Sequence, residues 1–234
     1  KPIQIFDRDN KSFFGADYFY EEIRKKLFLN FGNETLYSEG LIIKTSLNTD
    51  LQKLAEESLI NGLIQYDKNQ GWRGVVDNLD KHNIEFADVI KKIKNPFPNK
   101  WFLTKIDKVG SDKLFLSSNE FKNIEVDLTL KTNKWLIDEK FEKDDLIFIE
   151  KNNLSYEIRQ IPDVNGAIIV IEPFSGDILA MSGGFSFNLS QFNRSTQAKR
   201  QPGSAFKPFV YISALKKGYT PSTLILDAPY VMDQ

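Results

Sequence analysis

The chain has 234 residues, with 31 Lys and Arg, 32 Asp and Glu, and a formal net charge of −1 at pH 7. This size allows a sizeable hydrophobic core, and the near-neutral charge creates no positive field for nucleic acid, so we expect no nucleic-acid partner. The chain has no cysteine and a single histidine, His82, which excludes disulfides and cysteine nucleophiles and leaves little scope for a zinc site. We predict no metal and no cofactor, and covalent chemistry must use a Ser or Thr with a base other than His.

The first 40 residues mix aromatic and charged side chains. From Asp17 to Phe31 the apolar residues recur at helical spacing, and Gly32 is placed as a helix stop. No apolar run of the sequence is long enough to span a membrane. The chain begins within a pattern and ends at Gln234 just after a strand-like approach, so we expect it to be part of a longer protein.

A strand and then the clearest helix of the sequence are predicted next. Residues 41–47 alternate in polarity, which predicts a strand. Thr49 and Gln52 match a capping box, which predicts the start of a helix. One stripe of this helix is expected to face the core. Its members are Leu51, Leu54, Ala55, Ser58, Leu59, Gly62, Leu63 and Tyr66.

Residues 75–160 have the texture of a small all-β module. Short β-rich runs at 101–109, 113–117 and 146–150 alternate with Gly, Asn, Asp and Lys turn residues. This pattern predicts a small barrel of about five strands.

The last part of the chain predicts a hairpin and then a buried helix. Residues 166–172 and 177–182 are two apolar strands joined by the turn signal at 173–176. From Ser204 through Lys217 the apolar spacing fits a helix, and Gly218 is placed to end it.

Ser204 and Lys207 are the candidate catalytic pair. They lie three residues apart at the N-terminus of the predicted helix, which places both side chains on one face. A serine hydroxyl needs a base, and a lysine partly buried near other polar or cationic groups can be held neutral enough to accept its proton. The N–H groups at the helix start favour negative charge on Ser204 and on an attacked carbonyl oxygen.

The Ser-x-x-Lys spacing alone does not identify a site. Ser213 and Lys216 repeat it nine residues later, on the opposite helix face, and we interpret Ser213 as an ordinary helix serine. Ser204 differs in context, since residues 202–203 (Pro-Gly) predict a sharp helix entry. Pro208 removes the backbone hydrogen bond to the Ser204 carbonyl. From these residues alone, a catalytic pair and an ordinary helix pair both stay open.

The longer segment from Gln191 to Phe209 strongly resembles the first active-site motif of class A penicillin-binding proteins, especially those of the 1A type. The resemblance covers nearly the whole chain. Residues 39–66 look like the start of the transpeptidase domain, residues 66–74 like the passage into an inserted β domain, and residues 166–184 like the central hairpin. It implies the N-terminal part of an α/β (α+β) transpeptidase-like serine acyltransferase scaffold with an inserted, small OB-like β-barrel domain.

The resemblance also implies a domain organisation. Residues 1–40 would be a linker after a glycosyltransferase domain that this chain lacks. Residues 41–74 would begin the transpeptidase domain, and residues 75–160 would form the inserted OB-like domain. Residues 161–234 would continue the transpeptidase domain through the Ser-x-x-Lys helix.

By the same resemblance, Ser204 is the acylated nucleophile and Lys207 the base or proton shuttle of a D-Ala-D-Ala transpeptidase or carboxypeptidase. The implied substrates are peptidoglycan stem peptides, and β-lactams acylate the same serine. The parent protein would maintain the cell wall and cell shape from the periplasmic side of the bacterial inner membrane, anchored by an N-terminal transmembrane helix outside this chain.

Two further motifs complete the family's site, a Ser-x-Asn turn and a Lys-Thr-Gly strand. No Lys-Thr-Gly occurs in the sequence. Ser-x-Asn occurs only at 117–119, inside the β module, where we interpret it as a turn. We therefore expect these 234 residues alone to lack turnover.

Other functions stay open beside the transpeptidase. One is a non-catalytic module that docks a partner through the β domain, such as an outer-membrane lipoprotein activator. Another is a serine hydrolase unrelated to the cell wall. We interpret Trp101 and Trp135 as core residues rather than a nucleic-acid surface, His82 as a solvated loop residue, and residues 183–184 (Gly-Gly) as a turn rather than a phosphate loop.

Overall fold

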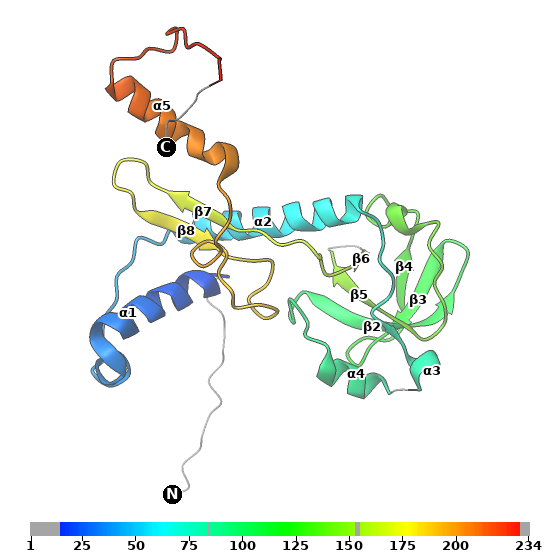
Figure 1. Ribbon diagram of the computed structural model, residues 1–234. Helices are drawn as coiled ribbons and strands as arrows, with labels where there is room; N and C mark the ends of the chain where they lie inside the picture. The colour runs from blue at the N-terminus through cyan, green and yellow to red at the C-terminus, as the bar shows by residue number, and fades with distance from the viewer. Residues whose placement is uncertain (1–14, 84, 153–154, 230–234) are drawn as a thin grey trace, which may run out of the picture. The chain divides into compact units, whose positions relative to one another are not determined.

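The structure is a computed structural model that describes residues 15–83, 85–152 and 155–229. The chain divides into two compact units, residues 1–197 and residues 198–234. Figure 1 labels their helices and strands. No described helix is both long enough and apolar enough to cross a membrane.

The elements of the first unit are α1 (Asp17–Ser38), α2 (Thr49–Asn69), β1 (Asp77–Asn78), α3 (Leu79–His82), α4 (Phe86–Lys92), β2 (Trp101–Val109), β3 (Lys113–Ser117), β4 (Ile124–Asp127), the 3-10 helix η1 (Lys134–Leu136), β5 (Asp145–Lys151), β6 (Tyr156–Arg159), β7 (Ile168–Ile171) and β8 (Ile178–Ser182). The second unit contains the 3-10 helix η2 (Gly203–Phe206) and α5 (Lys207–Lys216). The architecture is α+β.

Helix α1 is broken where the sequence predicts a stop. Gly32 has φ 77° and ψ 177°, outside the helical region, and the chain resumes a helical course to Ser38. The first turn is the part that packs, because Tyr18 and Phe19 are buried. Phe19 contacts Ala16 and Met181 in a small core beside β8.

The strand predicted at residues 41–47 is wrong. This segment is extended but belongs to no strand. Its beginning lies in solvent, where the side chain of Ile42 is 90% exposed. Only its end reaches a sheet edge: Ser46 Oγ donates to Ile178 O at 2.7 Å, and Asn48 N donates to Leu179 O at 2.9 Å. A strand requires a continuous ladder, which two contacts do not provide.

Helix α2 begins one residue earlier than the capping box predicts. Asn48 is the N-cap, and its Oδ1 accepts hydrogen bonds from Asp50 N at 3.1 Å and Leu51 N at 3.0 Å. The predicted apolar stripe is partly wrong, since Leu54 is 60% and Tyr66 55% exposed. The residues of α2 that are buried are Gln52, Ala55, Ile64 and Asp67. Two of these, Gln52 and Asp67, are polar, and a pattern of apolar residues cannot identify buried polar side chains.

The strands predicted in the β module are confirmed, but a closed barrel is not. Six antiparallel strands form one sheet in the order β1-β5-β2-β3-β4, and β6 pairs with β5. In the described part of the chain no ladder joins β4 to β6. A side chain bridges them instead: Asn133 Nδ2 donates to Asp127 O at 3.0 Å and Tyr156 O at 2.9 Å, and Asn133 Oδ1 accepts from Ile158 N. Asn133 is fully buried.

The predicted hairpin is confirmed as the two-stranded sheet β7–β8, with Ile169 opposite Met181. Its turn is closed by Gly176 N, which donates to Glu172 O at 2.9 Å. The hairpin lies along α2 (Figure 1). Strand β8 therefore lies between β7 and residues 46–52. These residues form hydrogen bonds with the backbone groups at the outer edge of β8.

Candidate active site

Ser204 and Lys207 lie in one tight turn of the second unit. Pro208 has no N–H for the carbonyl of Ser204, and the N–H of Lys207 donates to that carbonyl instead. The predicted helix therefore begins as the 3-10 helix η2 and continues as α5 from Lys207. In a 3-10 turn, residues three apart eclipse one another. This geometry places the two side chains on the same side of the turn.

The entry to this turn depends on a glycine. Gly203 has φ +52°, in the left-handed region that other residues enter at a cost. A Cβ added there would meet no atom within 4 Å, so the requirement for glycine comes from the backbone alone. The sharp entry predicted from Pro202-Gly203 is thus present.

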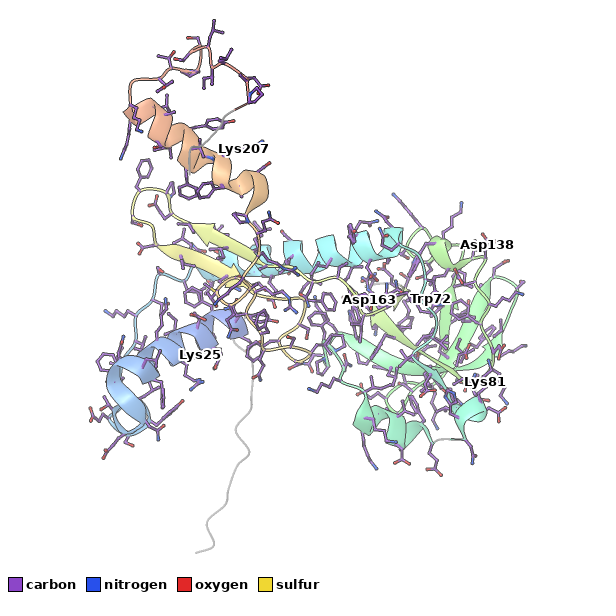
Figure 2. All side chains as sticks on the ribbon, in the orientation of Figure 1. Lys25, Trp72, Lys81, Asp138, Asp163 and Lys207 are labelled. Carbon is purple, nitrogen blue, oxygen red and sulfur yellow. The ribbon has the colours of Figure 1, made fainter. Side chains whose placement is uncertain are left out.

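Both side chains are open to solvent in this unit, and Figure 2 labels Lys207 on α5. Neither Ser204 Oγ nor Lys207 Nζ hydrogen-bonds to another residue that the structure describes. The expectation of a buried helix is not met: α5 contains no buried residue, and Phe209 is 66% exposed. Within residues 198–229 no other helix or strand covers it. The helix ends as predicted, with Gly218 at φ 88°.

The second Ser-x-x-Lys match stays separate from the first. Ser213 lies in the middle of α5 and Lys216 at its last residue, both exposed. Ser213 follows Lys207 by six residues of α-helix, a rotation of about 240° at 3.6 residues per turn, so the two side chains lie on different faces.

The loop that leads towards this segment is tightly packed beneath β8. A Cβ at Gly183 would lie 2.1 Å from Asn193 Oδ1, and one at Gly184 would lie 2.4 Å from the hydroxyl of Tyr18. Only glycine fits at either position, because the neighbouring atoms are held by other contacts. The Gly-Gly pair therefore allows the chain to pack closely against Asn193 and Tyr18.

Asn193 organises this loop, and sequence reasoning did not single it out. It is 2% exposed. Its Oδ1 accepts from Ser195 N at 3.0 Å, its Nδ2 donates to Met181 Sδ at 3.3 Å, and its N–H donates to Gln197 Oε1 at 2.7 Å. Asn193 is a single amide within the segment from Gln191 to Phe209. A single residue forms no periodic pattern, so no feature of the sequence indicated its role.

Titratable groups gather where α1, α2 and this loop meet. Burial raises the pKa of Glu56 to about 7, and the neighbouring carboxylate of Asp17 adds to the effect. Burial also raises the pKa of Tyr18 to about 12. The Tyr18 hydroxyl donates to Ser190 O at 2.7 Å and so ties α1 to the loop. These groups lie in a different unit from Ser204.

The remaining predicted residues lie apart from the pair. Ser118 Oγ accepts from Phe121 N at 3.0 Å, so residues 117–119 begin a turn as predicted. Trp101 is 1% exposed and Trp135 is half-buried against the sheet core, which confirms the core interpretation. His82 is exposed as predicted, but it ends α3 rather than lying in a loop, and its Nδ1 contacts Asp77. Among the described residues, no group of three or more His, Cys, Asp and Glu could hold a metal ion.

Comparisons with known proteins show which proteins this chain is similar to. Residues 166–234 match the family described as penicillin binding protein transpeptidase domain. Over 245 residues the chain is 35% identical to penicillin-binding protein 1A of Rickettsia felis, covering 100% of this chain and 30% of that protein. It is 32% identical over 242 residues to penicillin-binding protein 1A of Haemophilus influenzae, covering 98% of this chain and 27% of that protein.

A solved structure is similar in fold as well. The crystal structure of penicillin-binding protein 1A from Haemophilus influenzae superposes with a TM-score of 0.78 at 27% sequence identity. The match covers 94% of this chain and 33% of that chain. The chain therefore spans about a third of the length of the relatives it matches.

Proposed function

This chain is related along its length to one segment of the penicillin-binding proteins of the 1A type, and from this relationship we propose that it carries the acylated serine of a peptidoglycan DD-transpeptidase. The observation that carries the proposal is the turn shared by Ser204 and Lys207 inside the region matched by the transpeptidase family. Ser204 is the nucleophile and Lys207 is the base.

The reaction has two steps. In the first, Ser204 Oγ bonds to the penultimate D-alanine carbonyl carbon of a stem peptide, and the peptide bond to the terminal D-alanine breaks. The serine proton passes through Lys207 to the departing amine. In the second, an amine of a neighbouring strand attacks the ester, gives up a proton and restores the Ser204 hydroxyl. Transfer to water in place of the amine gives the carboxypeptidase reaction, and a β-lactam acylates Ser204 by opening its ring.

The turn geometry supports these roles. Residues three apart in a 3-10 turn lie side by side, which is the relation that a nucleophile and its base require. The N–H groups at the start of the helix favour negative charge near Ser204. Neither feature holds a substrate, so further chain that binds the stem peptide is needed to align the carbonyl for attack. We infer that the 234 residues alone do not turn over substrate.

The chemistry of the substrate suggests where the protein works. Peptidoglycan lies outside the inner membrane, so the longer protein would act on the periplasmic side, held by a membrane anchor outside this chain. The six-stranded β domain does not carry Ser204 and would serve to dock a partner, of which an outer-membrane lipoprotein activator is one kind.

Intact-mass analysis after incubation with a penicillin tests the proposal. The full-length protein is expected to gain one penicilloyl mass, and Ser204→Ala is expected to gain none. Ser213→Ala is the matched control, because it removes a hydroxyl from the second Ser-x-x-Lys match and should keep the adduct. An adduct that persists in Ser204→Ala, or no adduct on folded full-length protein, would disprove the assignment.

A non-catalytic docking module is the second candidate, and the isolated β domain core favours it. Eleven buried residues of that domain form a core of their own. If folded full-length protein gains no penicilloyl mass, this second function is the one to pursue.

A further inference from the structure

Asparagine is followed directly by glycine twice in the chain, at residues 61–62 and at residues 165–166. Asparagine is among the residues that react spontaneously in proteins. In such a pair the backbone nitrogen of the glycine can attack the side-chain amide carbon, because glycine has no Cβ to hinder the approach. The two pairs lie in different local structures, one inside α2 and the other in the connection between β6 and β7.

Asn165 has the geometry for this attack. Its Oδ1 accepts a hydrogen bond from Gly166 N at 3.0 Å, so the side chain is folded back onto the next peptide nitrogen. Asn165 is also exposed, which admits the water and the base that the reaction needs. An intramolecular reaction is fast when its two reacting groups are held close together, and this contact meets that condition.

The backbone N–H of Phe185 supplies a second feature. It donates to the same Oδ1 at 2.8 Å. Phe185 is 3% exposed and packs with Ile64, Trp101 and Phe148, so this donor is held in place. Negative charge develops on Oδ1 when a nitrogen adds to the amide carbon, and a fixed N–H aimed at that oxygen stabilises the charge. The N–H of Phe185 is therefore positioned as an oxyanion donor for a reaction of Asn165 itself.

Asn61 differs in its backbone. It lies in the interior of α2, where the N–H of Gly62 is committed to the carbonyl four residues earlier. The helix holds that nitrogen in its own hydrogen-bond ladder and away from the preceding side chain. Asn61 is exposed as Asn165 is, so it is a matched control within the same chain.

We propose that Asn165 is a site of spontaneous self-modification, which converts the Asn165-Gly166 pair to a succinimide and then to aspartate and isoaspartate. Gly166 N gives its proton to a solvent base and bonds to Asn165 Cγ. The bond from Cγ to the side-chain nitrogen breaks, and that nitrogen takes a proton from solvent and leaves as ammonia. Water then opens the ring at either carbonyl, and the ring nitrogen regains a proton as the N–H of Gly166.

Isoaspartate formation changes the connection between β6 and β7. Opening of the ring at the main-chain carbonyl sends the backbone through Cβ and Cγ and adds one methylene between residues 165 and 166. The oxygen that accepts from Phe185 N then belongs to the main chain. The hydrogen bond that joins the segment before β7 to the segment after β8 is thereby displaced.

Ageing of the full-length protein in heavy-oxygen water at mildly alkaline pH tests this inference. Opening of the succinimide places one heavy oxygen in each modified residue, which separates ageing from later digestion in ordinary water. Mass spectrometry of the peptides then gives the rate at each pair. In the folded protein we expect Asn165 to react at least about tenfold faster than Asn61. In guanidinium chloride the two rates should become similar, because both pairs then lack fixed structure.

Gly166→Ala is the matched variant. The added methyl group hinders the attack, so the rate at Asn165 should fall at least about tenfold. A Cβ at residue 166 would lie 3.3 Å from Leu59 Cδ1, an atom of a side chain that can move, so we expect the variant to fold. The comparison of folded with denatured parent needs no variant, and it tests the inference even where Gly166→Ala does not fold.

A rate at Asn165 that is lower in folded than in denatured parent would overturn the inference, because the bonds from Gly166 N and Phe185 N would then protect the amide. Equal rates at Asn165 and Asn61 in the folded protein would overturn it as well. A rate at Asn165 at least as high in folded as in denatured parent supports it. These outcomes are independent of whether a penicillin acylates Ser204, so the proposed function stands or falls separately.

Discussion

The side-chain amide of Gln52 makes two hydrogen bonds with the backbone of Met181. Gln52 Nε2 donates to Met181 O at 3.0 Å, and Met181 N donates to Gln52 Oε1 at 2.8 Å. Gln52 is fully buried, and its amide occupies the outer edge of β8 as a neighbouring strand would. A helix side chain thereby satisfies a strand edge and fixes the hairpin on α2.

Gln52→Leu is expected to lower the free energy of unfolding by about 2–4 kcal/mol, because it leaves the N–H and C=O of a buried residue unpaired. Urea denaturation followed by far-UV circular dichroism measures the change. Gln65→Leu is the control on the same helix, since the Gln65 amide is exposed and bonds only to Asn69; a change within about 0.5 kcal/mol is expected there. Equal losses for both variants would show that the Met181 contacts are unimportant.

Asp67→Asn is expected to destabilise the junction between α2 and the β domain. The Asp67 carboxylate is 3% exposed and accepts from Arg73 Nη1 at 2.7 Å and Gln160 Nε2 at 2.7 Å. Arg73 also bonds to Ile161 O and Asp163, so Asp67 joins the segments that enter and leave the β domain. Because Arg73 is partly exposed and keeps its pairing with Asp163, the loss is expected to lie between the value for an exposed pair, about 0–1 kcal/mol, and that for a fully buried one, about 3–5 kcal/mol.

Thermal and urea unfolding measure the effect of Asp67→Asn. Glu142→Gln is the matched control, because Glu142 pairs with Lys81 at the same 2.7 Å but both side chains are about 60% exposed. An exposed pair contributes about 0–1 kcal/mol, so this variant should be nearly neutral. Figure 2 labels Asp163 at the junction and Lys81 in the β domain away from it. A neutral Asp67→Asn would contradict the role of the junction.

The raised pKa of the Glu56 carboxyl predicts how the free energy of unfolding depends on pH. Its pKa is raised from 4.5 to about 7, so the folded chain binds this proton more tightly than the unfolded chain. Stability contributed by Glu56 is therefore greatest at low pH and declines as pH rises from 4.5 to about 7. The raised pKa of Asp17 acts in the same direction.

Urea denaturation at pH 5 and pH 8 tests this, with Glu56→Gln as the variant. Because Gln has no proton to lose, the decline between the two pH values should be smaller in Glu56→Gln than in the parent. Glu57→Gln, an exposed neighbour on α2 whose carboxylate contributes least to the raised pKa of Glu56, should reduce the decline by less than Glu56→Gln does. Parallel pH profiles for parent and Glu56→Gln would contradict the assignment.

Gly203→Ala is expected to impair acylation through the backbone. An alanine at φ +52° costs about 1–2 kcal/mol, and relief of that strain would rotate the turn that holds Ser204 beside Lys207. The acylation rate of the full-length protein with a penicillin measures the loss. Gly62→Ala is the control: the added Cβ meets no atom within 4 Å, and in α2 it should stabilise the helix by about 0.5–1 kcal/mol and leave the rate unchanged.

Local patterns in the sequence identified most elements. Short β-rich runs between turn residues located β2, β3 and β5, and two apolar runs around a turn signal located the hairpin. The alternation at 41–47 misled, since extended chain beside a sheet has the same local geometry as a strand. The Ser204 turn was found from Pro and Gly, whose effects on the backbone do not depend on distant residues.

The buried polar contacts could not be found this way. Gln52, Asp67 and Asn133 each satisfy groups far away in the sequence, and a lone amide or carboxylate has no periodicity. The sequence by itself determined most of the local elements and the turn that brings Ser204 beside Lys207, because both follow from contacts within a few residues. Only the tertiary structure decided that Phe97, in the loop before β2, packs on Phe185 after β8, because that contact joins residues 88 positions apart.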